Sequence, residues 1–115
     1  MSTASKILIR LTKFSNKTSN VLDVTQQFNA AGSFYQDLSG WDEAMVQIVS
    51  PSGAISFKTT NDDGAVTGQL LPVPEVPVNW VTVQGIKLSD GATVSSISAS
   101  DIVKFVNFGK YLQLS

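Results

Sequence analysis

The 115-residue chain contains no cysteine and no histidine. Without cysteine there is no disulfide, no thiolate nucleophile and no sulfur-ligated zinc site. Without histidine the chain lacks the commonest general base near neutral pH and the commonest metal ligand. Composition still permits a Ser-Lys dyad, but no S-x-x-K motif supports one. We therefore expect a non-enzymatic protein with no cofactor, held together by packing and hydrogen bonds.

Charge and long apolar runs are also scarce. Charged residues make up 15% of the chain and the formal net charge is −1, whereas an average globular domain is about 25% charged. Such a chain has no overall field to attract nucleic acid or an anionic membrane, so neither is expected as its main partner. No apolar stretch approaches the roughly 20 residues of a membrane-spanning helix. The start, MSTASKILIRLTK, shows no export signal, and synthesis in the cytosol is expected.

What the sequence does contain is centred on the stretch Gly40–Asp62. Apolar residues alternate before and after the break at Pro51-Ser52-Gly53. Successive strand residues point to opposite sides of a sheet, so the pattern predicts two strands that share one buried face. We expect them to form a β-hairpin. The residues placed in the core are Val46, Ile48, Ile55 and Phe57.

Similar short alternating runs, separated by Gly, Ser, Asn and Asp, occur along the whole chain. They predict strands over residues 6–14, 33–38, 78–88 with a bulge at Gly85, 93–97, 102–108 and 110–114, and either a strand or a short helix over 21–28. Many short strands at this spacing are typical of sandwiches and jelly rolls. The expected fold is an all-β antiparallel β-sandwich, jelly-roll-like, in a single domain covering 1–115.

Two segments could reach beyond such a domain. Residues 1–17 are expected to form an N-terminal arm or an edge strand. Residues 64–78 contain three of the four prolines. Because proline has no amide hydrogen to give to a sheet, this segment is expected to be an extended loop or arm.

Acidic residues gather at two places. Asn61-Asp62-Asp63 could supply oxygen ligands to calcium, but it offers only two carboxylates and lacks EF-hand spacing, so a turn is favoured. Asp42 and Glu43 are neighbours on an expected strand and would point to opposite faces. They are therefore unsuited to act as a paired acid and base.

Basic residues dominate the start of the chain. Lys6, Arg10, Lys13 and Lys17 all precede the first acidic residue, Asp23. Such a cluster could bind an acidic neighbouring subunit or a nucleic-acid backbone. The favoured interpretation is the solvent-facing side of an edge strand, where lysine discourages pairing with other strands.

The two tryptophans, Trp41 and Trp80, are the aromatic candidates for binding. An exposed tryptophan on a β-sandwich could stack on the apolar face of a sugar ring. Tryptophan is usually largely buried, so packing in the core or at a subunit interface is favoured. We take Lys6, Arg10, Lys13, Trp41 and Trp80 as the candidate interaction residues.

The runs GWDEAMVQIVSPSGAISFKTTND (Gly40–Asp62), VNWVTVQGIKL (Val78–Leu88) and VKFVNFGKYLQL (Val103–Leu114) resemble segments of small structural proteins from tailed bacteriophages, including crAss-like and marine phages. The likeness covers the C-terminal two-thirds of the chain. It implies a β-sandwich that coats a capsid or forms part of a head fibre or tail.

The expected function is therefore that of a non-enzymatic virion structural protein, located in the virion. A capsid auxiliary or decoration protein that binds the major capsid protein and copies of itself is favoured. The alternative is a carbohydrate- or host-surface-binding module of a phage fibre or tail.

Overall fold

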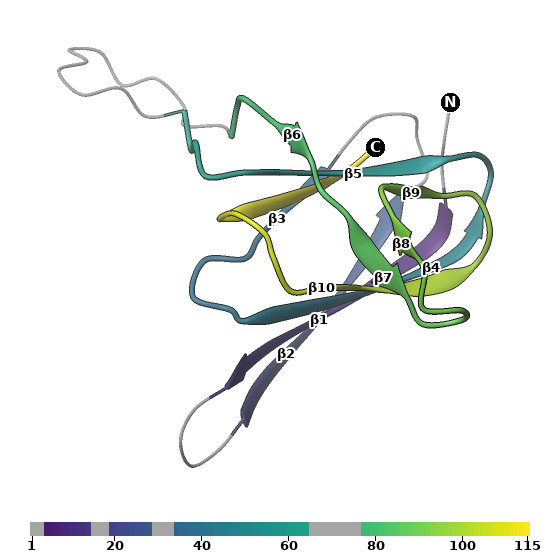
Figure 1. Cartoon of the computed structure of the whole chain (residues 1–115), viewed down its shortest axis with the longest axis horizontal. Helices are drawn as coiled ribbons and strands as arrows, with labels where there is room; N and C mark the ends of the chain where they lie inside the picture. The colour runs from purple at the N-terminus through teal and green to yellow at the C-terminus, as the bar shows by residue number, and fades with distance from the viewer. Residues whose placement is uncertain (1–3, 15–18, 29–33, 65–76) are drawn as a thin grey trace, which may run out of the picture.

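A computed structural model describes residues 4–14, 19–28, 34–64 and 77–115 of the chain. These residues form eleven strands and no helix, and hence no helix that could cross a membrane. Every strand pairing among them is antiparallel. The strands form two sheets packed into one domain (Figure 1). The expected all-β, sandwich-like fold is confirmed, whereas the jelly-roll connectivity stays a prediction.

The first sheet has six strands in the order β2-β1-β4-β10-β7-β8. In that order, their bounds are Ser19–Phe28, Ala4–Phe14, Glu43–Pro51, Asp101–Phe105, Gly85–Lys87 and Thr93–Val94. Its middle is made by long strands from the first half of the chain together with β10 from near the C-terminus. Segments far apart in sequence are thereby joined in one layer.

The second sheet is smaller and has the order β3-β11-β5-β6. In that order, its strands are Phe34–Asp37, Tyr111–Leu114, Ile55–Thr60 and Val81–Thr82. The short strand β9, Ser96–Ile97, also pairs with β5. At the end of the chain, Ser115 and Ser56 exchange backbone hydrogen bonds of 3.1 and 2.7 Å. The C-terminus is thus tied to the middle of this sheet.

The core lies between the two sheets and follows the alternation seen in the sequence. Phe57 from the second sheet meets Phe105 from the first edge to face, with ring centroids 5.1 Å apart. The four residues expected in the core are all buried. The buried hydrophobic residues are Ala4, Ile7, Ile9, Leu11, Leu38, Ala44, Val46, Ile48, Ile55, Phe57, Val83, Ile97, Val103, Phe105, Leu112 and Leu114.

The expected hairpin over Gly40–Asp62 is wrong, although its strands and buried faces are right. Strand β4 pairs with β1 and β10, whereas β5 pairs with β11, β6 and β9, so the two strands belong to different sheets. The chain changes sheet between Pro51, where β4 ends, and Ile55, where β5 begins. Ser50, just before this crossing, has a φ of 51° in the left-handed region. A turn between opposing sheets buries the same alternate residues as a hairpin would, because both arrangements direct one face of each strand inward.

The expected arm or edge strand at residues 1–17 also needs correction. Strand β1 lies between β2 and β4, so it is an interior strand of its sheet. Its residues Ile7, Ile9 and Leu11 are fully buried. A segment that contributes this much to the core is not a detachable arm, because removing it would expose the inner face of the sandwich.

Two predicted strands are each divided between sheets. Within 78–88, β6 pairs with β5 in the second sheet and β7 pairs with β10 in the first, so Gly85 begins a new strand and is not a bulge. Within 93–97, β8 pairs with β7 and β9 pairs with β5. The segment at 21–28 is a strand, the first of its two expected alternatives. Most of the Pro-rich segment at 64–78, namely residues 65–76, lies outside the described residues.

Gly85 is required where the chain enters the first sheet. A Cβ atom at this position would clash with Val103 Cγ1 and lie 2.8 Å from Cε1 of Phe105. Both neighbours are buried in the core and have little room to move. The backbone of β7 can therefore lie this close to β10 only without a side chain.

We expect Gly85→Ala to reduce the free energy of unfolding by about 1–3 kcal/mol, the usual cost of overpacking a core. Urea unfolding followed by tryptophan fluorescence measures the change. Gln84→Ala, at the exposed neighbouring position, is the matched control and should change stability by less than about 0.5 kcal/mol. Equal stability of the two variants would contradict the close approach at Gly85.

Candidate interaction surfaces

The Asn61-Asp62-Asp63 segment makes local hydrogen bonds typical of a turn. Asp62 Oδ1 accepts a bond from the Gly64 amide at 2.9 Å, and Asp62 Oδ2 accepts one from Asn79 Nδ2 at 2.7 Å. Asn61 Oδ1 accepts a hydrogen bond from the backbone amide of Lys110, just before β11, at 3.0 Å. The hydrogen bonds from the Gly64 amide and, secondarily, from Asn79 lower the pKa of Asp62 below its ordinary value. Across the described ranges, no cluster of three acidic side chains is arranged to hold a metal ion.

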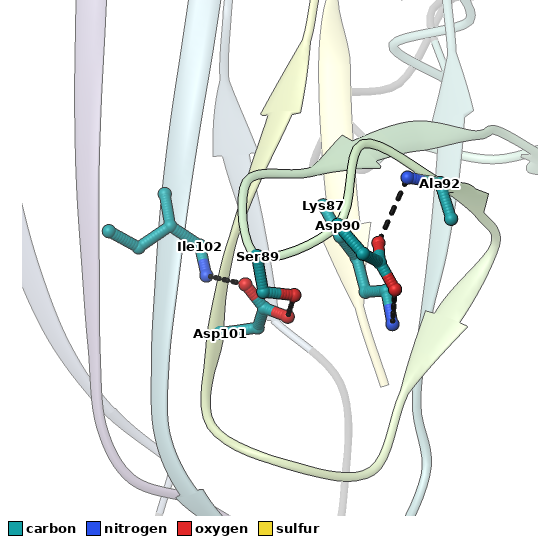
Figure 2. A network of polar contacts seen from close by, with 6 residues as sticks. All are labelled: Lys87, Ser89, Asp90, Ala92, Asp101 and Ile102. Carbon is teal, nitrogen blue, oxygen red and sulfur yellow. Dashed lines mark hydrogen bonds and ion pairs between the residues drawn. The ribbon is translucent and has the colours of Figure 1, made fainter.

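A second acidic network holds the turn between β7 and β8 (Figure 2). Asp90 Oδ1 accepts a hydrogen bond from the Ala92 amide at 2.9 Å, and Asp90 Oδ2 lies 3.2 Å from Lys87 Nζ. Asp101 accepts hydrogen bonds from the hydroxyl of Ser89 at 2.7 Å and from the backbone amide of Ile102 at 2.8 Å. The pKa of each aspartate is lowered, mainly by the Ala92 amide for Asp90 and by Ser89 for Asp101. These carboxylates hold the turn in place.

Asp42 and Glu43 have separate partners, in keeping with their expected opposite directions. Asp42 Oδ2 accepts a hydrogen bond from the Phe14 amide at 2.7 Å. Glu43 Oε1 lies 2.9 Å from Lys104 Nζ, across the pairing of β4 with β10. One carboxylate therefore closes the end of β1, and the other joins two neighbouring strands.

The basic candidates do not gather into one patch. Lys6 and Arg10 occupy the outer face of β1, because they alternate with its buried residues. Lys13 falls on the opposite face, where the strand extends past the core, and Lys17 lies outside the described residues. Arg10 Nε is paired with Asp23 Oδ1 at 2.8 Å, and this pairing raises the pKa of Arg10 and lowers that of Asp23. The expected solvent-facing side is present on an interior strand, not on an edge.

The two tryptophan candidates lie in different surroundings. Trp41 is half-buried against the core, and its amide donates to the carbonyl oxygen of Leu38 at 3.0 Å. Trp80 is also half-buried, but its ring lies 6.2 Å from that of Tyr35 at a tilt of 43°. Tyr35 also meets Tyr111 edge to face, with centroids 5.8 Å apart. We call Tyr35, Trp80 and Tyr111 the aromatic cluster.

The aromatic cluster lies on the outer face of the second sheet. Tyr35 stands opposite Gln113, and Gln113 stands opposite Lys58, so polar side chains adjoin the rings on the same face. Tyr35 is 46% exposed. Of these three aromatic residues, only Trp80 is among the candidate interaction residues predicted from the sequence. The alternation along β3 and β11 predicts that both tyrosines face outward. Only the register between the two strands brings their rings together.

The outer face of the first sheet carries apolar side chains of its own. Leu8, Met45 and Ile102, from β1, β4 and β10, line a groove of about 340 Å³. All three are half-buried. The Arg10–Asp23 and Lys104–Glu43 ion pairs lie on this same face, because Arg10 and Lys104 both stand opposite Met45. We call the surface around Leu8, Met45 and Ile102 the apolar outer face.

The acidic turns give a prediction for pH. A carboxyl group whose pKa is lower in the folded chain than in the unfolded chain stabilises the fold above its unfolded pKa, and this contribution is lost as the pH falls through the folded pKa. Asp62 and Asp90 have pKa values lowered from an ordinary 3.8. We expect Tm to change little between about pH 7 and 5 and to fall below about pH 4.

Asp62→Asn should lower Tm at neutral pH and reduce the fall of Tm on acidification, because the asparagine side chain has no carboxylate for acid to protonate. Differential scanning calorimetry across the pH range compares the two proteins. Identical curves of Tm against pH would contradict a stabilising role for the Asp62 carboxylate.

The described surface thus consists of acidic turns whose carboxylates are engaged locally, an aromatic cluster on one sheet and an apolar outer face on the other. Its chemistry is suited to binding. Comparison of the chain with protein-family models, curated proteins and solved structures gives no match.

Proposed function

We propose that this chain is a non-enzymatic structural protein of a bacteriophage virion, a capsid auxiliary or decoration protein that binds the major capsid protein and neighbouring copies of itself. The observation that carries the proposal is the apolar outer face of the first sheet. In antiparallel sandwiches the outer face of a sheet is commonly polar because water covers it. Leu8, Met45 and Ile102 depart from that pattern on three neighbouring strands, although the exposed Gln47 stands opposite both Leu8 and Ile102. Partly exposed apolar side chains on an outer face favour contact with another protein.

The charges around this face support the same role. Arg10 and Lys104 are neutralised by Asp23 and Glu43. The surface therefore presents apolar groups beside paired charges, which cost less to cover than isolated ones. The location in the virion and the phage partners come from the sequence resemblance to tailed-phage structural proteins, and they form the part of the proposal that particles must test.

The first experiment is a reconstruction of purified phage particles together with a protein inventory of the same preparation. We expect repeated copies of the chain on the capsid lattice, with the face containing Leu8, Met45 and Ile102 turned toward a neighbouring protein. Absence of the chain from purified particles would remove the proposal.

A substitution within the face tests the contact itself. Met45→Glu places a carboxylate at a half-exposed outer position, where water can solvate it, so the free domain should tolerate it. The same charge in a closed interface should weaken incorporation into particles by at least about tenfold, since a buried unpaired charge costs on the order of a few kcal/mol. Thr82→Glu, at an exposed position on β6, is the matched control and should incorporate normally.

The alternative function, carbohydrate binding, has one observation in its favour. The rings of Tyr35, Trp80 and Tyr111 adjoin Gln113 and Lys58 on one outer face. Aromatic rings beside polar side chains could stack on a pyranose and bond its hydroxyl groups. The same cluster also serves the plainer purpose of joining β3 to β11, so we rank this function second.

If the alternative holds, a glycan array should give saturable binding, and Tyr35→Ala or Trp80→Ala should weaken it by about tenfold or more, the loss of one ring contact of roughly 1.5 kcal/mol. Phe14→Ala removes an exposed aromatic ring away from the cluster and is the matched control. Binding that survives both cluster substitutions, or an array without any binding, would contradict a sugar site here.

A further inference from the structure

Strand β2 forms one edge of the first sheet and is unusually long for an edge. It has ten residues, Ser19–Phe28, which at strand spacing span roughly 30 Å. Among the described residues it pairs only with β1, and it stands last in the strand order. The strands at the other ends of the two sheets, β3, β6 and β8, have four, two and two residues. Natural sheets commonly protect their edges by making them short, and β2 lacks this protection.

The sequence of β2 also lacks the residues that discourage strand pairing. SNVLDVTQQF contains no proline, lysine or arginine. Its single charge, Asp23, is already paired with Arg10 of β1 at 2.8 Å. An edge strand with free backbone groups and little net charge can accept a further strand, because pairing places no unbalanced charge in the new ladder.

Exposed apolar side chains gather along the same pair of strands. Phe14 is 59% exposed, Val21 50% and Leu22 44%. Val21 lies on the outer face of β2 and Leu22 on the inner face, because Leu22 stands opposite the buried Leu11. The end of the β1–β2 pair that carries these residues projects beyond the two-layer body (Figure 1). Both faces of this edge therefore offer apolar surface to an added strand.

We propose that β2 pairs antiparallel with β2 of a second copy of this chain, joining two first sheets into one continuous sheet across a two-fold axis. The inference rests on the proposed function, in which copies of the chain contact one another, and it names the surface they use. A near-neutral, apolar edge selects a partner strand of the same character, and β2 itself has that character. On β2 itself, an acidic or basic partner would find no charge beyond Asp23, which is already paired with Arg10.

The two-fold arrangement also accounts for both exposed faces of β2. In an antiparallel pair, side chains of one copy meet those of the other on each face of the sheet. The outward Val21 would then be covered on one face and Leu22 on the other, at symmetric positions.

The test is the oligomeric state of the purified chain, measured by sedimentation velocity from micromolar to millimolar concentration. The wild-type chain should form a dimer. The variant Val21→Lys/Thr25→Lys places lysines on exposed outer positions of β2 and should remain monomeric, because like charges then face one another across the axis. The control Thr82→Lys/Thr93→Lys adds the same charge to exposed positions on β6 and β8 and should dimerise normally.

Mixing variants of opposite charge tests whether the strand that pairs with β2 belongs to a second copy of the chain. Mixing the lysine variant with Val21→Glu/Thr25→Glu should restore a dimer that contains one chain of each kind, whatever the register. A wild-type chain that stays monomeric up to millimolar concentration would overturn the proposal, and so would a lysine variant that still dimerises. A mixture of the two variants that stays monomeric would equally count against it.

A measurement on the unaltered chain covers the case in which the variants fail to fold. In a dimer, the β2 amides that point away from β1 become paired, so alternate amides should gain protection from hydrogen exchange as concentration rises. If these amides are protected only in assembled particles, another protein occupies the edge and the proposed self-pairing is wrong. If the chain dimerises in solution but is missing from purified particles, this inference stands and the proposed virion function is removed.

Discussion

The contact on which the structure depends is the one between its two sheets, and its centre is the edge-to-face pair of Phe57 and Phe105. These rings come from β5 and β10, which share no backbone pairing. Side-chain packing holds these two rings together, in a chain that has no cysteine to form a disulfide. The close passage of Gly85 beside Phe105 follows from this contact, because the ring fills the space where a Cβ atom would lie. The strand crossings from one sheet to the other surround this centre.

How much of the fold could be predicted follows from what alternation does and does not specify. A period of two identifies which residues face inward, and it correctly predicts that Val46, Ile48, Ile55 and Phe57 lie in the core. It does not identify which strand lies next in the sheet. A hairpin and a crossing between sheets bury the same residues, so alternation alone wrongly predicts that β4 and β5 pair with each other. For the same reason, alternation predicts a single strand over 78–88, where the structure has β6 and β7 in different sheets. The change of sheet there depends on packing around Gly85.

The candidate sites were less predictable than the core because they depend on register between distant strands. The Arg10–Asp23 ion pair forms because β1 and β2 align at those two residues, and no feature of either residue alone predicts it. Trp80 was identified from its residue type, whereas Tyr35 and Tyr111 join it only because β3 pairs with β11. The acidic turn at Asp62 was predictable, because a turn of this composition is specified by bonds to its own neighbouring backbone.

The two surfaces proposed for protein contacts use different chemistry and therefore do not compete. The apolar outer face offers side chains that point away from the sandwich, perpendicular to the sheet. The edge of β2 offers backbone groups that point sideways, within the plane of the same sheet. A chain could therefore extend its first sheet into a second copy while keeping the face around Met45 in contact with another protein. Because Arg10 belongs to β1 and Asp23 to β2, their ion pair stands where edge and outer face meet, and it keeps both surfaces near neutral.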